Sequence, residues 1–228
     1  MTSSLSAPSV RALSSKQERR LVTYLEDQFL ELTRGYKKRS EPSTTVPTLP
    51  TYLEAAQKLL ALVLQIPPID PSTALRTAFL LRLTNDVLSS VSGYAPTQDA
   101  LPCLLDWLDD LDQAWVAVLQ SQVWDPESGA GTDLVVPVDD AAAGVRSSPV
   151  SQTERTRLKS LLLGAAANLE EWLAGMNAGE GGDAAAEDLE GALARLGLQE
   201  SFDDLFWRTL QDLGALGGSV VTMDEGGC

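Results

Sequence analysis

The sequence predicts an all-α protein, an up-and-down helical bundle with a long disordered loop and a small helical hairpin near its C-terminus. Leucine-rich stripes recur every three or four residues, which is the spacing of one helix face. Capping-box and proline signals stand before several of these stripes. No segment combines the alternation and turn chemistry of paired strands, so we expect no β-strand.

The first expected helix covers about residues 16 to 36. Ser15 followed by Glu18 is a capping-box pattern, and the helix ends in a basic run. Its apolar residues share one face: Leu21, Leu25, Phe29, Leu32 and Tyr36. A proline-containing linker then spans residues 40 to 50.

Three further helices complete the expected bundle over residues 15–124. The second helix, about 52–65, begins with Thr51 and Glu54 and ends at two prolines. Asp70 is the expected N-cap of the third helix, with Pro71 at its first position. The fourth helix ends near residue 123, and its seam is formed by Leu101, Leu104, Leu108, Leu111, Trp115 and Val118. Short connections favour antiparallel neighbours.

The remaining segments alternate between order and expected disorder. Residues 125–150 are rich in glycine, serine and proline and predict a disordered linker, despite a brief apolar run from Leu134 to Val138. Residues 151–176 form a long helix that packs on the bundle and begins with Ser151 and Glu154. A flexible hinge (177–183), a C-terminal helical pair (184–196 and 202–216) and a disordered tail (217–228) follow. Residues 1–14 form a disordered N-terminus.

Composition limits the functions that the chain can perform. The net charge is −15 and the isoelectric point is near 4.3, so direct binding of nucleic acid or an anionic membrane is disfavoured. The charge either keeps the protein in solution or attracts a basic protein. No apolar run reaches the roughly 18 residues of a membrane span. Two cysteines make no disulfide framework, so we expect an intracellular protein, in the nucleus and/or cytoplasm.

The chain contains no histidine, and this absence argues against enzymatic chemistry. We therefore predict no catalytic residue, no cofactor and no metal site. The densest carboxylate cluster could hold a hard cation, but its members follow a helix rather than a glycine-centred loop, so a solvated acidic face is favoured. Its members are Asp106, Asp109, Asp110 and Asp112.

An acidic, aromatic segment near the C-terminus is the candidate protein-binding surface. Its four anchors are Phe202, Phe206, Trp207 and Leu210, which suit a helix laid into a partner's apolar groove. The alternative is that this helix folds back on its own bundle. Trp107 and Trp124 also miss the strongest stripes, and we expect them to pack rather than to anchor a partner.

A second candidate site is a basic patch at the end of the first helix. It consists of Arg34, Lys37, Lys38 and Arg39. The patch could bind a phosphate group or act in nuclear import. It could equally compensate the helix dipole and pair with the protein's own acidic face.

Three stretches resemble uncharacterised helical proteins of filamentous fungi. They are Leu-Thr-Arg-Gly-Tyr-Lys-Lys-Arg (32–39), Trp-Leu-Asp-Asp-Leu-Asp-Gln-Ala-Trp (107–115) and Val-Trp-Asp-Pro-Glu-Ser-Gly (123–129). The resemblance covers roughly the first 130 residues and implies a fungal origin. It carries no catalytic or binding residue.

We therefore expect a non-enzymatic helical subunit or adaptor that binds other proteins. The alternative is an acidic chaperone or assembly factor for a basic client, such as a histone-like or ribosomal protein. Binding of a basic client would weaken steeply with salt, whereas apolar groove docking would not. A third class, an enzyme that works through carboxylates alone, would need a pocket with paired acids of perturbed pKa.

Overall fold

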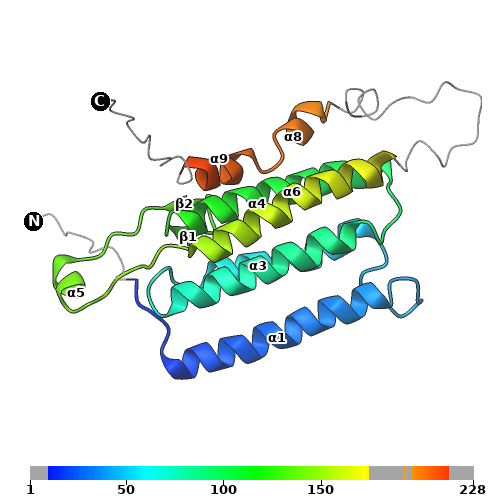
Figure 1. Cartoon of the computed structure of the whole chain (residues 1–228). Helices are drawn as coiled ribbons and strands as arrows, with labels where there is room; N and C mark the ends of the chain where they lie inside the picture. Colours follow the sequence, from blue (N-terminus) through cyan, green and yellow to red (C-terminus); the bar gives the residue numbers. More distant parts are fainter. Residues whose placement is uncertain (1–9, 175–192, 194–196, 216–228) are drawn as a thin grey trace, which may run out of the picture.

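The computed structural model describes residues 10–174, 193 and 197–215 of the chain (Figure 1). Some of the predicted segments lie outside these residues. They are the hinge (177–183), the tail (217–228), nearly all of the first C-terminal helix (184–196) and most of the N-terminal segment (1–14).

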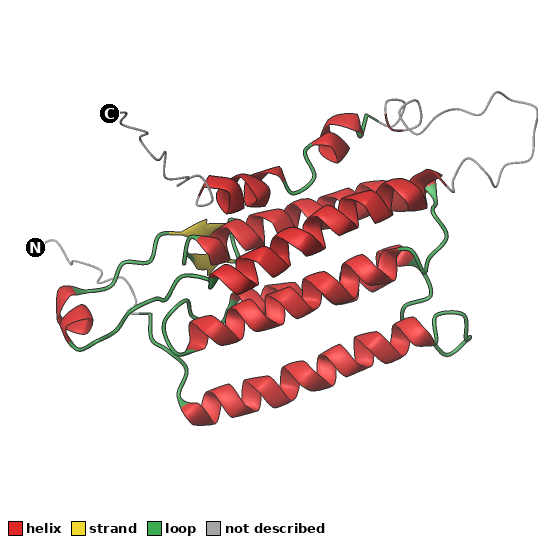
Figure 2. Ribbon diagram, viewed as in Figure 1, coloured by secondary structure: helices red, strands yellow, loops and turns green. Residues whose placement is uncertain are grey.

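Five long helices form the bundle and lie lengthwise beside one another (Figure 1). They are α1 (Ser15–Lys37), α2 (Leu49–Leu64), α3 (Ser72–Val91), α4 (Leu101–Leu119) and α6 (Gln152–Ala174). Helix α2 contacts α1, α3 and α4, and α3 also contacts α6. A short 3-10 turn, η1 (Gln98–Ala100), leads into α4. The predicted all-α class is confirmed, as Figure 2 shows.

Local capping signals explain where these helices begin. Helix α6 starts with the predicted pair: the Glu154 N–H donates to Ser151 Oγ, and the Ser151 N–H donates to Glu154 Oε2 at 3.0 Å. The box of α1 lies one residue earlier than predicted, because Ser14 caps the helix and pairs with Gln17.

Helix α3 begins differently from the prediction. Pro71 occupies the N-cap position rather than the first helical position, and Ser72 starts the helix. The Asp70 carboxylate does not cap α3; it accepts hydrogen bonds from Ser148 and lies 3.5 Å from the Arg146 guanidinium. The Ser148 hydroxyl holds the pKa of Asp70 below its usual value. Asp70 therefore ties the start of α3 to the segment before α6.

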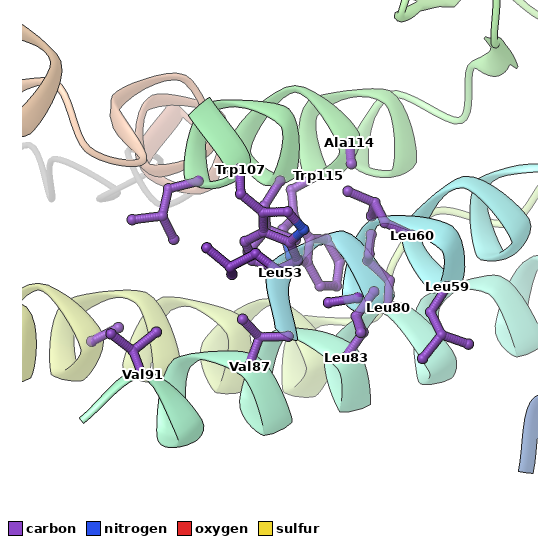
Figure 3. Close-up of a cluster of buried hydrophobic side chains, with 14 of the residues drawn as sticks. Leu53, Leu59, Leu60, Leu80, Leu83, Val87, Val91, Trp107, Ala114 and Trp115 are labelled. Carbon is purple, nitrogen blue, oxygen red and sulfur yellow. The ribbon is translucent and has the colours of Figure 1, made fainter. Parts of the chain in front are cut away.

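Apolar side chains from all five long helices meet in one core. Figure 3 shows part of this core, with labelled side chains from α2, α3 and α4. The α4 seam is buried as predicted, and Trp115 at its centre is fully buried. The Trp115 indole N–H donates to Thr84 Oγ1 of α3 at 2.9 Å, which satisfies its polar atom inside the core. On α1, Leu25, Phe29 and Leu32 are buried, whereas Leu21 and Tyr36 are half-buried at the core's edge.

The prediction that the chain has no strand is wrong for one short hairpin. Strands β1 (Val123–Asp125) and β2 (Ala130–Thr132) pair antiparallel beside α4 (Figure 2). The turn forms because the Asp125 carboxylate accepts from the Glu127 N–H and the Ser128 hydroxyl, while Gly129 takes a left-handed φ of 65°. Gly131 leaves no room for a side chain, because a Cβ there would clash with Gln122 and Ala117.

The hairpin and the five-residue helix α5 (Val138–Ala142) stand where a disordered linker was expected over residues 125–150. Helix α5 has no buried residue and projects from the bundle at the end of two chain arms (Figure 1). The turn residues of the hairpin can be seen in the sequence. The face of α4 against which the hairpin packs cannot, because it becomes known only in the folded chain.

The C-terminal segment is broken into two pieces. One continuous helix was expected over 202–216, but α8 (Gln199–Asp203) and α9 (Trp207–Ala215) are separated by residues 204–206. Phe206 lies at the break with a φ of 59°, a conformation that is rare for a residue with a bulky side chain. Phe206 is 1% exposed, so its burial in the core offsets the strain at this position. Helix α9 packs on α4 and α6.

Candidate protein-interaction groove

A groove of about 700 Å³ runs between α4 and the C-terminal segment, α8 and α9. Figure 1 shows α9 lying along α4, on the side of the bundle opposite α1. The polar residues that line the groove are Asp106, Asp109, Asp110, Asp112, Glu200, Asp204 and Arg208. The apolar residues that line it are Leu105, Leu108, Leu198, Leu205, Phe206 and Trp207. The groove therefore combines six carboxylates, one guanidinium and six apolar side chains.

Asp112 differs from the other carboxylates of α4 because it is buried, with an exposed fraction of 2%. Its carboxylate accepts from the backbone N–H groups of Thr209 at 2.9 Å and of Arg208 at 3.3 Å. Its backbone carbonyl accepts from the Thr209 hydroxyl at 3.1 Å. Arg208 and Thr209 are the second and third residues of α9, whose N–H groups have no partner inside the helix. Asp112 thus caps α9 from a different helix, and the predicted solvated face is wrong at this residue.

Arg208 is the one cation among the residues that line the groove. Its Nη1 lies 2.6 Å from Asp109 Oδ1 and 3.5 Å from Asp112 Oδ2. The hydrogen bond to Asp109 raises the pKa of Arg208. One guanidinium against six carboxylates leaves the lining with five more negative than positive charges. Arg208 pairs with Asp109 and Asp112, so the other four carboxylates have no cationic partner among the lining residues.

Asp110 lies on the α2 side of the acidic cluster. Gln57 of α2 donates from Nε2 to Asp110 Oδ2 at 2.7 Å. Partial burial raises the pKa of Asp110, and the nearby charges of Asp109 and Asp106 raise it further. The cluster thus resists gaining more negative charge and favours a cationic partner.

The four predicted anchors do lie together on the C-terminal segment, but they have different roles. Phe206 is buried in the bundle core, and Phe202 and Leu210 are half-buried against it. Trp207 alone among the four is largely exposed, at 57%, and it lines the groove. The fold-back alternative therefore describes α9, and Trp207 is the anchor that remains accessible to a partner.

The predicted basic patch lies at the end of α1, away from the groove (Figure 1). Arg34 pairs with Glu31 at 2.8 Å, and Lys38 lies 3.7 Å from Glu41. Arg39 donates from Nε to the Gly93 carbonyl at 2.7 Å, and its guanidinium stacks over the Tyr36 ring at 4.5 Å. Arg39 thus joins α1 to the end of α3, which is a structural role. Lys37, in the last turn of α1, is placed to interact with the helix dipole.

The two tryptophans that miss the strongest stripes pack as expected. Trp107 is 4% exposed in the core, and Trp124 is half-buried against it. Burial raises the pKa of the Cys103 thiol, so the thiol stays protonated and unreactive at neutral pH. Within the described ranges, no three cysteine, aspartate or glutamate side chains are grouped so that they could hold a metal ion.

The roles of Arg208 and Thr209 could not be recognised in the sequence. Both residues lie within the aromatic acidic segment, but nothing in its pattern names their partner. Thr209 and Asp112 are 97 residues apart. The one available signal was the polar pair Arg-Thr directly after Trp207. The segment was interpreted as a binding helix from its apolar residues, and this pair was not part of that pattern.

No protein-family model matches this chain, and neither a curated protein nor a solved structure matches it. Among the helices that the structure describes, none has both the length and the apolar character needed to cross a membrane. The functional proposal therefore depends on the residues of the groove.

Proposed function

We propose that the protein is a non-enzymatic, intracellular protein-binding subunit or adaptor, and that the groove between α4 and α8–α9 receives a basic segment of its partner. One observation carries the proposal: the groove has six carboxylates, one guanidinium and an exposed tryptophan among its lining residues. A partner segment rich in arginine or lysine complements this charge.

The electrostatics of the groove favour such a partner. A concave surface lined by one sign of charge focuses the field and speeds the encounter with an oppositely charged ligand. The pair of Arg208 and Asp109 is an internal example of the same recognition, with a guanidinium held at hydrogen-bonding distance. Further carboxylates, such as Asp106 and Glu200, remain for cations from a partner.

Trp207 adds a second form of recognition. Trp207 is 57% exposed, while its neighbour Phe206 is buried in the core and Leu205 is partly buried against it. A tryptophan face attracts arginine and lysine by cation–π interaction, worth roughly 0.5–1 kcal/mol at an exposed site. Tryptophan is also enriched among residues that dominate binding energy at protein interfaces. Trp207 is thus the expected anchor at the rim of the groove.

The same groove supports the second candidate, an acidic chaperone or assembly factor for a basic client such as a histone-like or ribosomal protein. The two candidates differ in how binding responds to salt. A chaperone that acts through net charge releases its client as ionic strength rises. An adaptor with an anchored tryptophan retains part of its affinity in salt. Either function would operate in the nucleus and/or cytoplasm.

The test is titration of the full-length protein with a hexa-arginine peptide, followed by calorimetry at 50 and 300 mM salt. We expect Asp106→Asn combined with Asp110→Asn to weaken binding about tenfold. The matched control is Asp139→Asn combined with Asp140→Asn, which removes the same charge from α5, outside the groove. Trp207→Ala should weaken binding at both salt concentrations.

Equal losses in the groove variant and the α5 variant would contradict a groove-centred site, because net charge alone would then explain binding. No effect of Trp207→Ala at high salt would favour the chaperone over the adaptor. Absence of binding by the unchanged protein at 50 mM salt would overturn both.

A further inference from the structure

A second surface lies in the segment between β2 and α5. It contains a short apolar run, Leu134, Val135, Val136, Pro137 and Val138. Val135 and Val138 are 82% and 84% exposed, more than any other large apolar side chain that the structure describes as exposed. Single exposed apolar residues are ordinary, but these two valines lie within four positions of each other. Helix α5, which Val138 begins, projects from the bundle (Figure 1).

The backbone of this segment is also without partners. Residues 133–137 form no helix, strand or turn. Within the described part of the chain, no backbone N–H or C=O of residues 133–136 takes part in a backbone–backbone hydrogen bond. Pro137 has φ −57° and ψ 146°, an extended conformation. An extended stretch with free donors and acceptors can pair with another strand.

Sequence chemistry favours a strand here, and at the edge of a sheet. Valine is enriched in strands, and proline is tolerated in edge strands. Asp133 precedes the valines, and Asp139 and Asp140 follow them. No lysine or arginine occurs between residues 125 and 145. The run is thus an apolar strand between acidic flanks.

We propose that residues 133–140 add as an edge strand to an exposed sheet edge of a partner protein, by β-augmentation. The partner's edge strand borders an apolar groove whose rim carries lysine and arginine. A small ubiquitin-like modifier can serve as a probe for a partner of this kind. The proposal is independent of the groove between α4 and α9, since none of these residues lines it.

The geometry of such a complex follows from the period of a strand. Leu134, Val136 and Val138 point to one face of the added strand, and Val135 points to the other. Val138 begins α5, so its addition unwinds the first turn of that helix. Helix α5 has five residues and none is buried, so unwinding it costs little free energy.

The test uses the full-length chain and a purified small ubiquitin-like modifier as the probe, followed by calorimetry. We expect Val135→Ala combined with Val138→Ala to weaken binding about tenfold or more, because Val138 loses its contact with the groove and Val135 loses apolar area on the opposite face of the paired strands. The bundle should remain unchanged in circular dichroism, since both valines are exposed. The matched control is Leu30→Ala combined with Leu163→Ala, which truncates exposed apolar residues on α1 and α6.

Two further measurements distinguish β-augmentation from other contacts. Asp139→Asn combined with Asp140→Asn should weaken binding and reduce its dependence on salt, because the basic rim loses its partners. Amide hydrogen exchange at residues 134–136 should slow in the complex, because these N–H groups become paired. Asp106→Asn combined with Asp110→Asn should leave this binding unchanged.

The proposal is overturned if the unchanged protein does not bind the probe at millimolar concentration. It is also overturned if the valine variant and the control variant bind equally, or if exchange at residues 134–136 stays fast in the complex.

Discussion

The two sides of α4 are buried in different ways. On the bundle side, Leu111 and Trp115 pack where α4 meets α2 and α3, and the contact is almost entirely apolar. On the other side, two apolar residues, Phe206 just before α9 and Leu213 within it, are buried. The other contacts that hold α9 are polar. Asp112 accepts hydrogen bonds at its start, and Arg155 and Gln120 donate to Asp212 near its end.

The contact of α4 with the bundle therefore depends on the volume of its side chains, whereas the contact with α9 depends on the direction of its hydrogen bonds. Apolar packing tolerates small shifts, whereas a buried carboxylate needs its donors in place. The groove exists because α9 is held at this position. A substitution at the contact between α4 and α9 should therefore release the C-terminal segment and leave the bundle folded.

The largest effect is expected on the bundle side. Trp115→Ala removes a fully buried ring and its hydrogen bond to Thr84, so the free energy of unfolding should fall by about 3–5 kcal/mol. Urea denaturation followed by circular dichroism measures this change. A loss below about 1 kcal/mol would show that the core does not depend on this seam.

An intermediate effect is expected at the buried carboxylate. Asp112→Ala leaves the first N–H groups of α9 without their cap, so the free energy of unfolding should fall by about 2–3 kcal/mol. Trypsin should then cut at Arg208 faster than in the unchanged protein, while the helical signal of the bundle persists.

The control for this change is Arg208→Gln, which removes the guanidinium but keeps the backbone N–H groups. Arg208 is about half-exposed, so its ion pair with Asp109 should contribute less than about 1 kcal/mol. Equal losses in the two variants would mean that the ion pair, rather than the cap, holds α9.

The smallest effect is expected at Asp110. Its pKa is raised by partial burial and by Asp109 and Asp106, so its charge opposes folding at neutral pH. Asp110→Asn should therefore stabilise the protein at pH 7, by up to about 0.5 kcal/mol, because solvent screens the repulsion.

The sign of the pH dependence follows from the raised pKa. The native state takes up a proton at Asp110 more readily than the unfolded chain does, so this penalty disappears as pH falls through the native pKa. Urea denaturation at pH 7 and at pH 4 should show the advantage of the variant at pH 7 and little of it at pH 4. A greater advantage at pH 4 would contradict the assignment.

Much of the bundle could be predicted from local sequence pattern. The stripes of α1, α4 and α6 mark the buried faces, and the pair Ser151 and Glu154 marks the start of α6, because both signals act within a few residues. The β1–β2 hairpin was missed because three-residue strands are too short for their alternation to be recognised.

The groove was less predictable than the helices that form it. Phe206 and Trp207 are neighbours of similar apolar character, and only the break before α9 sends one into the core and the other toward solvent. Asp112 and Asp109 belong to one acidic run, and a helix pattern does not say which of them another helix will cover.

The sequence by itself determined the helical class, the strong negative charge and the lack of any imidazole, since periodicity and composition need no knowledge of distant contacts. The tertiary structure decided that Asp112 meets Thr209 across 97 residues, that the carboxylates of α4 gather beside α9 and that Trp207 stays exposed. The physical reason is the distance along the chain over which each interaction acts. Helix signals act within a turn or two, whereas a groove is defined by how separate helices pack.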